Sequence, residues 1–211
     1  MKITAPKISE ALTPSHFTDI FYEEDPELEM AFVTDSEFTN EILERLRIYH
    51  AIIKNSQFNH TDFGKIQLTD VRFENCDLSN ANLRESSIHR VEFHNCKLLG
   101  TDFSESSIGN VTFNDSIVNM AMFGNSKLEK VLFKEAVLQQ TDFYDCKFKG
   151  VGFDLCDLSG TSFEQTALKG VDISTSRFDT LTVSIEDLNG CKVSTHQAVQ
   201  LASLMGLVVK E

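Results

Sequence analysis

Five cysteines are the first candidates for chemistry in this sequence, since thiolates bind soft metals, form disulfides and act as nucleophiles. Each lies two residues before a large apolar residue that recurs at every fifth position; they are Cys76, Cys96, Cys146, Cys156 and Cys191. A shared repeat position predicts a shared environment rather than a convergent site, so we expect buried thiols that act as small apolar groups. The spacing of Cys76 and Cys96 allows a disulfide in principle, but a cytoplasmic location would keep both reduced.

The six histidines form no ligand cluster in the same register. Four occupy outward positions beside the expected corners, and two lie near opposite ends of the chain; they are His50, His60, His89, His94, His16 and His196. The sequence also has no glycine-rich phosphate loop and no Ser/His/Asp order of the kind that nucleophilic catalysis uses. We therefore expect no metal, no cofactor and no catalytic residue, and we do not expect an enzyme.

The net charge of −13 narrows the choice of partners. Affinity for nucleic acid comes mainly from Lys and Arg that neutralise phosphates, so we expect no direct binding to DNA or RNA. An acidic chain is suited instead to a basic protein surface. No apolar run is long enough to cross a membrane, and the N-terminus lacks the pattern of a signal peptide, so we expect a cytoplasmic protein.

The elements that must position these residues are set by a repeat of five. From Val33 to Val193, all 33 positions in this frame hold Leu, Ile, Val or Phe, and all 14 phenylalanines from Phe38 onward fall in it. The position two residues earlier is almost always small. A period of five fits neither a helix nor a simple strand, so each unit must turn a corner. The position two residues after the large one is Asn, Asp or Gly at half of the sites, which favours tight turns there.

Segments such as VRFENCDLSNANL resemble the pentapeptide-repeat family, in which four units form the four sides of a square coil. The resemblance implies an all-β solenoid, a right-handed quadrilateral β-helix of about eight coils, with a length of about 40 Å at a coil spacing of about 4.8 Å. Residues 20 apart should then stack. The phenylalanines form two opposite columns in this arrangement, a core ladder of Phe63, Phe103, Phe123, Phe143 and Phe163 facing Phe73, Phe93, Phe113, Phe133 and Phe153.

Both ends leave the pattern, as the open edges of a solenoid require. We predict an N-terminal cap or extension over residues 1–30, the β-helix over 31–193, and a C-terminal helix and short apolar strand over 194–211. Ser194 or Thr195 is the expected N-cap of the helix and Gly206 its end. Its apolar face would be Ala198, Leu201, Leu204 and Met205. The tail resembles that of the quinolone-resistance (Qnr-type) branch, in particular the chromosomal homologues of Gram-positive (enterococcal) bacteria, which implies a cap and a homodimer contact; the apolar stripe suits capping alone equally well.

Charge is distributed unevenly over the four expected faces. The face with Phe63 and Phe103 sums to −6, the next to +3, and the others to −3 and −2. Its carboxylates are the candidate partner-binding residues Glu41, Glu44, Asp62, Glu85, Asp102, Glu105, Asp142, Asp145 and Glu164. The adjacent face carries Lys127, Lys130, Lys147, Lys149 and Lys169. Ordinary solvation explains such a face, and so does partial imitation of DNA by a stiff acidic rod.

The resemblance to the Qnr-type branch implies a non-enzymatic, DNA-mimicking protein. Such a protein binds DNA gyrase, and with it topoisomerase IV, protects them from quinolones, and could itself inhibit gyrase. Many Gram-negative members interrupt the repeats with loops that engage gyrase, whereas the frame here is unbroken. A structural scaffold of the same fold that binds another basic protein is the alternative, because the fold alone does not define a function.

Overall fold

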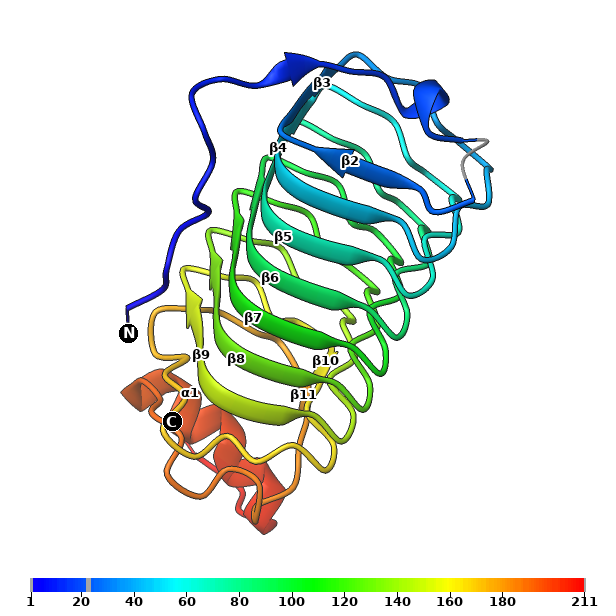
Figure 1. Ribbon diagram of the computed structural model, residues 1–211. Helices are drawn as coiled ribbons and strands as arrows, with labels where there is room; N and C mark the ends of the chain where they lie inside the picture. The colour runs from blue at the N-terminus through cyan, green and yellow to red at the C-terminus, as the bar shows by residue number, and fades with distance from the viewer. Residues whose placement is uncertain (1, 22–23, 211) are drawn as a thin grey trace.

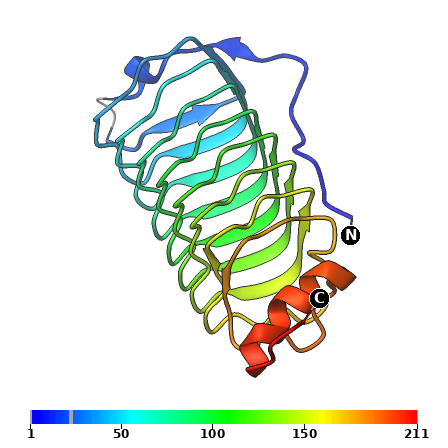
Figure 2. The same cartoon turned by 180° about the vertical axis from the view of Figure 1, so that it is seen from behind.

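The computed structural model describes residues 2–21 and 24–210 as one elongated solenoid, seen from two sides in Figures 1 and 2. Residues 1 and 211, which belong to the two predicted end segments, lie outside the described part. The repeating element is an eight-residue strand that bends at a corner and recurs once per coil. The strands are β1 (Thr13–Pro14), β2 (Glu27–Glu29), β3 (Ala31–Thr34), β4 (Arg47–Lys54), β5 (Gln67–Glu74), β6 (Ser87–His94), β7 (Ser107–Asn114), β8 (Lys127–Lys134), β9 (Lys147–Asp154), β10 (Thr161–Ser162) and β11 (Leu181–Thr182).

The strands pair in parallel with a register of 20 residues, as the stacking of equivalent positions predicts. Ile48 pairs with Leu68, and the same offset continues through β9. This confirms the right-handed quadrilateral β-helix of about eight coils with a C-terminal helix. The register is the physical link between sequence and surface, because any two residues 20 apart become neighbours on one face.

Corners are made by left-handed backbone at every fifth residue from Met30 to Gly170. This is the position that the sequence marks as a turn, and at half of the sites Asn, Asp or Gly adopts the conformation at little cost. The other corners hold residue types that do not favour left-handed backbone, among them Met120 and Leu155. Those corners persist because the ladder bonds and buried side chains on both sides leave the backbone no alternative.

The core is a pair of aromatic columns. Phe93, Phe113 and Phe133 stack with ring centroids 4.9 and 4.7 Å apart. Phe103 and Phe123 stack at 4.9 Å in the opposite column, and the two columns meet edge-on. Phe73 stacks on Phe93 at 5.1 Å, so the expected ladder is present from Phe73 to Phe163. Phe63 stands apart from Phe103 because Leu83 separates them, and its ring stacks on Phe38 instead.

The small inward position has a polar function that the sequence pattern does not reveal. Most of its hydroxyls are buried and donate a hydrogen bond to a backbone carbonyl 23 residues earlier, whereas Ser56 and Ser86 donate to the carbonyl two residues earlier. Thr101 donates to Leu78 at 2.8 Å, and Thr141 donates to Val118 at the same distance. No buried side-chain nitrogen or oxygen within residues 2–21 and 24–210 lacks a partner. The small residue fits inside the coil, and its hydroxyl forms a hydrogen bond to the preceding coil.

The N-terminal 30 residues contain two different parts. β1 and β2 pair with β3 and β4, and the 3-10 helix η1 (Phe17–Asp19) buries Phe17 against the first phenylalanines of the core, so this part is an added coil and cap. Residues 2–11 instead run along the outside of the rod toward its other end (Figure 1). We name this second part the N-terminal strap.

The C-terminal cap differs from the prediction in two respects. The helix α1 (Thr195–Leu201) begins at Ser194 as expected, and the 3-10 helix η2 (Ala202–Met205) ends at Gly206. However, residues 207–210 form no strand. The predicted apolar face also does not cap the last coil: Ala198, Leu204 and Met205 are exposed, and Leu201 is half-buried against the core, while a dimer contact through this face stays a prediction.

Gln197 closes the cap instead of that apolar face. Its amide donates to the carbonyls of Ile173 and Ser176 at 2.8 and 2.7 Å, and it is the one buried residue of α1. The last coil ends in backbone carbonyls that need donors, and an amide supplies two of them where an aliphatic side chain supplies none.

Candidate partner-binding face

The nine candidate carboxylates lie on one side of the rod, which we name the acidic face: residues 41–45, 61–65, 81–85, 101–105, 121–125, 141–145 and 161–165. One column of this face is a continuous parallel register of outward side chains. It runs in order through Ile42, Asp62, Asn82, Asp102, Met122, Asp142 and Ser162. Every coil contributes one residue to the column, so carboxylates two coils apart recur at about twice the strand spacing, roughly 10 Å.

Three of the nine carboxylates also hold the backbone. Asp62, Asp102 and Asp142 each accept a hydrogen bond from the backbone N–H two residues later, at 2.9, 2.8 and 3.1 Å. In each case the second carboxylate oxygen makes no hydrogen bond to any described residue. These side chains are half-buried, so each is held in one orientation with one oxygen directed away from its turn.

The remaining six carboxylates divide into paired and unpaired groups. Glu85 forms an ion pair with Lys65 at 3.7 Å, and Glu105 forms one with Arg84. The other four are exposed and form no ion pair with a described residue; they are Glu41, Glu44, Asp145 and Glu164. Exposed pairs contribute little to stability, but they lower the local negative potential. Apart from Glu85 and Glu105, the carboxylates of this face form no ion pair with a described residue, so unpaired charge extends from Glu41 to Glu164.

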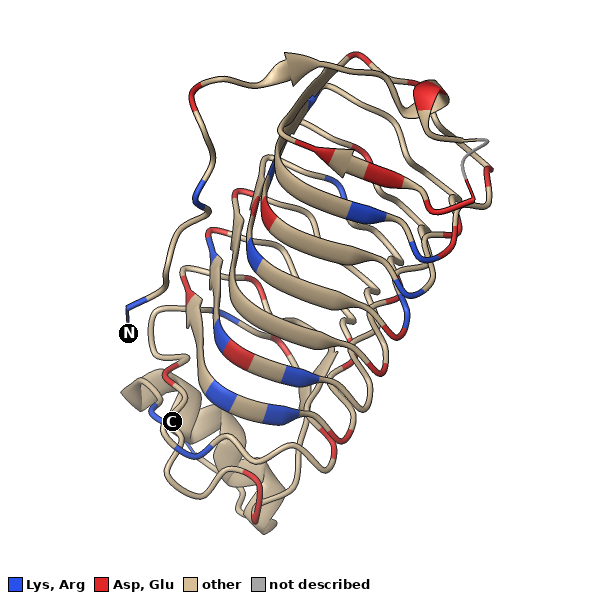
Figure 3. Ribbon diagram, in the orientation of Figure 1, with Lys and Arg blue, Asp and Glu red and all other residues tan. Residues whose placement is uncertain are grey.

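The neighbouring face carries the positive charge that the sequence count predicts. Lys127 and Lys130 lie on β8, and Lys147 and Lys149 lie on β9, where Figure 3 shows the blue segments side by side. Lys149 pairs with Glu129 at 2.8 Å, and this hydrogen bond lowers the pKa of that carboxyl group. The rod therefore has an acidic face and a basic patch that share one edge.

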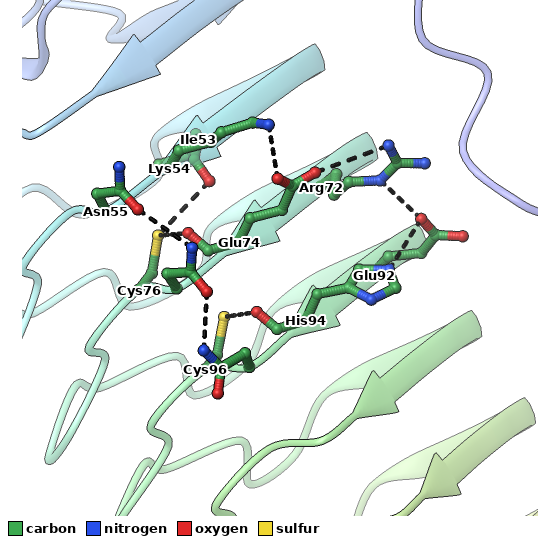
Figure 4. Close-up of polar contacts among 11 residues, drawn as sticks. Ile53, Lys54, Asn55, Arg72, Glu74, Cys76, Glu92, His94 and Cys96 are labelled. Atoms are coloured by element: carbon green, nitrogen blue, oxygen red, sulfur yellow. Dashed lines mark hydrogen bonds and ion pairs between the residues drawn. The ribbon is translucent and has the colours of Figure 1, made fainter.

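A network of ion pairs joins charged side chains of β4, β5 and β6 and neutralises them. Figure 4 shows Lys54, Glu74, Arg72, Glu92 and His94 joined in one chain across these strands. Lys54 lies 2.6 Å from Glu74, Arg72 lies 2.9 Å from Glu92, and His94 lies 3.3 Å from Glu92. Every carboxylate in this network has a cationic partner, so it offers little free charge to a macromolecule. Sequence reasoning missed it, although the 20-residue spacing of opposite charges was a usable signal.

An asparagine ladder runs beside this network above two thiols. Asn75 donates to Asn55 at 3.2 Å, and Asn95 donates to Asn75 at 2.8 Å. Beneath it Cys76 and Cys96 are buried, and the neighbouring Cys76 thiol together with burial raises the pKa of Cys96. All five cysteines are free thiols.

The other three thiols are held in the protonated form. Burial raises the pKa of Cys146 to about 12 and those of Cys156 and Cys191 to about 11. Cys146 also donates a hydrogen bond to the carbonyl of Phe123 at 3.0 Å. Across the part of the chain that the structure describes, no three His, Cys, Asp or Glu side chains gather as metal ligands. Neutral thiols in such positions pack as small apolar groups.

Two buried carboxylates were not among the candidates: Asp157, which pairs with Arg177 at 2.6 Å, and Asp70. Asp70 accepts two hydrogen bonds from Arg90, at 2.6 and 2.7 Å, and one from the backbone N–H of Lys7 at 2.8 Å. His50 donates to the carbonyl of Lys7 at 2.9 Å. Burial by itself raises the pKa of Asp70, but the bonds from Arg90 and Lys7 outweigh burial and lower it. This cluster fastens the N-terminal strap to the rod.

The fold and the surface define a class: a filled β-helical rod whose chemistry resides in the charge of its faces. A family model described as pentapeptide repeat region matches residues 66–136 and 86–163. The chain belongs to the pentapeptide-repeat proteins. No curated protein matches the sequence. Among the described residues no helix has the length and apolar character that a membrane crossing requires.

The solved structures to which the chain is similar include QnrB1 and HetL. A trypsin-treated form of QnrB1, a plasmid-mediated fluoroquinolone resistance protein, has 20% sequence identity and a TM-score of 0.50; the match covers 88% of this chain and 99% of that chain. HetL, a pentapeptide-repeat protein involved in heterocyst differentiation regulation in the cyanobacterium Nostoc, has 11% identity and a TM-score of 0.38, with coverage of 83% and 92%. At this identity the likeness to QnrB1 shows the fold.

Proposed function

We propose that this protein binds DNA gyrase and topoisomerase IV and protects them from quinolones as a non-enzymatic, partial mimic of DNA in the cytoplasm. The observation that carries the proposal is the row of outward carboxylates along one side of a stiff rod. The likeness to QnrB1, which is a fluoroquinolone resistance protein, supports the choice of target. A topoisomerase that holds duplex DNA has a basic groove, and an acidic rod complements such a groove.

The acidic face has a lower linear charge density than duplex DNA. Duplex DNA carries about one charge per 1.7 Å. The acidic face carries a net charge of −6 over about 40 Å, or about one per 7 Å. This net charge already includes Lys65 and Arg84, which pair with Glu85 and Glu105. Charge density alone therefore supplies a fraction of what DNA offers, and the shape of the rod and a few placed carboxylates must supply the rest.

The C-terminal segment supports a homodimer in this proposal. Met205, Leu207 and Val208 are exposed by 65%, 55% and 87%, beyond the cap that Gln197 completes. A second copy that covers the same residues by two-fold symmetry would remove this apolar area from water. Such a dimer would place two acidic rods in one particle.

The alternative is a scaffold that binds a different protein. The basic patch on β8 and β9 favours it, because those lysines share an edge with the acidic face and would repel the rim of a strongly basic groove. A partner with charges of both signs would fit that edge better than a DNA-binding groove does.

The experiment is gyrase supercoiling in the presence of ciprofloxacin and increasing amounts of the protein. The test variant replaces Asp102, Glu105, Asp142 and Asp145 by their amides. Asparagine at 102 and 142 keeps an oxygen that accepts the turn hydrogen bond, so the fold is preserved. A control variant makes the same change in charge on other faces, with Asn at Asp35, Asp115, Asp172 and Asp179.

Each outcome decides a separate point. Protection by the wild type and the control but not by the test variant supports gyrase protection through the acidic face. Protection by all three proteins keeps the target and rejects this face. Protection by none of them rejects the target and favours the scaffold.

A further inference from the structure

Half a coil in the middle of the rod has no charged residue. Residues 116–125 read SIVNMAMFGN, and three of the outward side chains are large and apolar. Ile117, Met120 and Met122 are exposed by 41%, 55% and 41%. Charged or polar residues occupy most equivalent outward positions elsewhere, so this half-coil interrupts the pattern at mid-length.

Apolar side chains of the adjoining coils extend this surface. Ile117 pairs in register with Val137, and Met122 lies on the acidic face between Asp102 and Asp142. Met120 forms the corner that joins the two faces. We name this surface the mid-rod apolar patch: Leu99, Ile117, Met120, Met122, Val137 and Tyr144.

The fold does not require these residues. Each lies at an outward or corner position, and the core beneath is filled by Val118 and Phe123. Met120 adopts left-handed backbone with φ of 56°, where Asn or Gly is favoured and where Gly100 stands one coil earlier. Solvation and local conformation both disfavour a methionine at that corner. Exposed apolar side chains grouped on two adjoining faces, with carboxylates beside them, are typical of a protein-binding surface.

The charges at the rim select the partner. Asp102 and Asp142 stack directly on either side of Met122, each with one oxygen that has no partner among the described residues. Carboxylates at this spacing repel nucleic acid and phosphate, whereas they pair with Lys and Arg. A second copy of the chain is a poor match for a basic helical partner, because its helix α1 is short and contains no Lys or Arg.

We propose that the mid-rod apolar patch and its flanking carboxylates bind an amphipathic basic helix of the partner protein, with an aliphatic or aromatic side chain seated on Met122 and Ile117. This inference rests on the proposed function, since it assigns the helix to the topoisomerase. It goes beyond mimicry of DNA, because duplex DNA presents no such apolar surface. The contact adds affinity that salt does not screen.

The test measures binding of intact gyrase holoenzyme to the immobilised protein at two salt concentrations. The patch variant carries Ile117→Thr, Met120→Asn and Met122→Gln, all at exposed positions. The control carries Met30→Asn, Leu155→Asn and Ile185→Thr, which remove three exposed apolar side chains elsewhere. Thermal unfolding verifies that both variants fold as the wild type does.

We expect the patch variant to bind at least about tenfold more weakly at both salt concentrations, with the salt dependence unchanged, while the control binds as the wild type does. Equal binding by patch variant, control and wild type overturns this inference and leaves the proposed function standing. Equal weakening of both variants also overturns it, because the effect is then not local. If the wild type itself does not bind gyrase, the proposed function fails, and the inference fails with it.

Discussion

Phe113 offers the most quantitative test of the aromatic core. Its ring lies between Phe93 and Phe133, at 4.9 and 4.7 Å, and meets Phe103 and Phe123 edge-on at 6.1 and 6.2 Å. Truncation of a buried phenylalanine to alanine costs about 3–5 kcal/mol. Because four aromatic contacts are lost together, we predict that Phe113→Ala lowers the free energy of unfolding by an amount at the upper end of this range, about 5 kcal/mol.

Phe73 is the matched control within the same column. It is buried like Phe113, but among the described residues its one aromatic neighbour is Phe93, at 5.1 Å. Aromatic pairs contribute about 0.5–1.5 kcal/mol each beyond burial, and Phe113 has three more of them. We therefore expect Phe113→Ala to cost at least about 1.5 kcal/mol more than Phe73→Ala. The pair Phe113→Leu and Phe73→Leu, which keeps most of the apolar volume, should show the same order.

The assay is urea unfolding followed by far-ultraviolet circular dichroism, since the chain has no tryptophan. Protein concentration is held constant because dimerisation would shift the apparent stability. If the two positions lose the same free energy within about 0.5 kcal/mol, the ring contacts contribute nothing beyond burial, and the interpretation of the columns as aromatic ladders is refuted.

Four further predictions concern single sites. Leu155→Asn should raise the melting temperature by a few degrees, because Asn adopts left-handed backbone at about 1 kcal/mol less cost; calorimetry against Leu155→Gln, which lacks that preference, measures it. Because the pKa of Asp70 is lowered in the folded protein, its carboxylate contributes fully to the free energy of unfolding above the ordinary pKa of 3.8, and this contribution is lost as pH falls through the folded pKa. The Lys7 amide resonance should therefore shift below about pH 4 in the wild type. Asp70→Asn should show no such titration. Cys191 is the least buried thiol and should be the first to react with a disulfide reagent at about pH 8, while the other four should react after unfolding; fast reaction of all five would contradict the assigned burial. Gln197→Ala should cost about 2 kcal/mol and expose α1 to proteolysis, since two buried carbonyls lose their donor, and an unchanged cleavage pattern would contradict this account of the cap.

The repeat is the part of this protein that the sequence by itself determined. The large apolar residue, the small residue and the corner recur every five positions, and each chain position therefore corresponds to one place on the coil. The 20-residue register followed without any long-range information, as did the aromatic columns from residue 73 to 163 and the placement of nine carboxylates on one face. A periodic fold allows this because its long-range contacts repeat one local rule.

Only the tertiary structure decided how the two ends of the repeat are capped and which charged side chains pair with one another. The N-terminal strap, fastened by Asp70, and the closure of the last coil by Gln197 depend on single contacts between distant residues. The sequence therefore misled at the C-terminus, where apolar spacing predicted a buried helix face and a strand. The pairing of Glu85 and Glu105 with Lys65 and Arg84, which leaves these two carboxylates locally neutralised, likewise depends on side-chain geometry across coils. The physical reason is common to all of these: a repeating pattern specifies the backbone path, whereas a contact made once has no pattern from which it can be predicted.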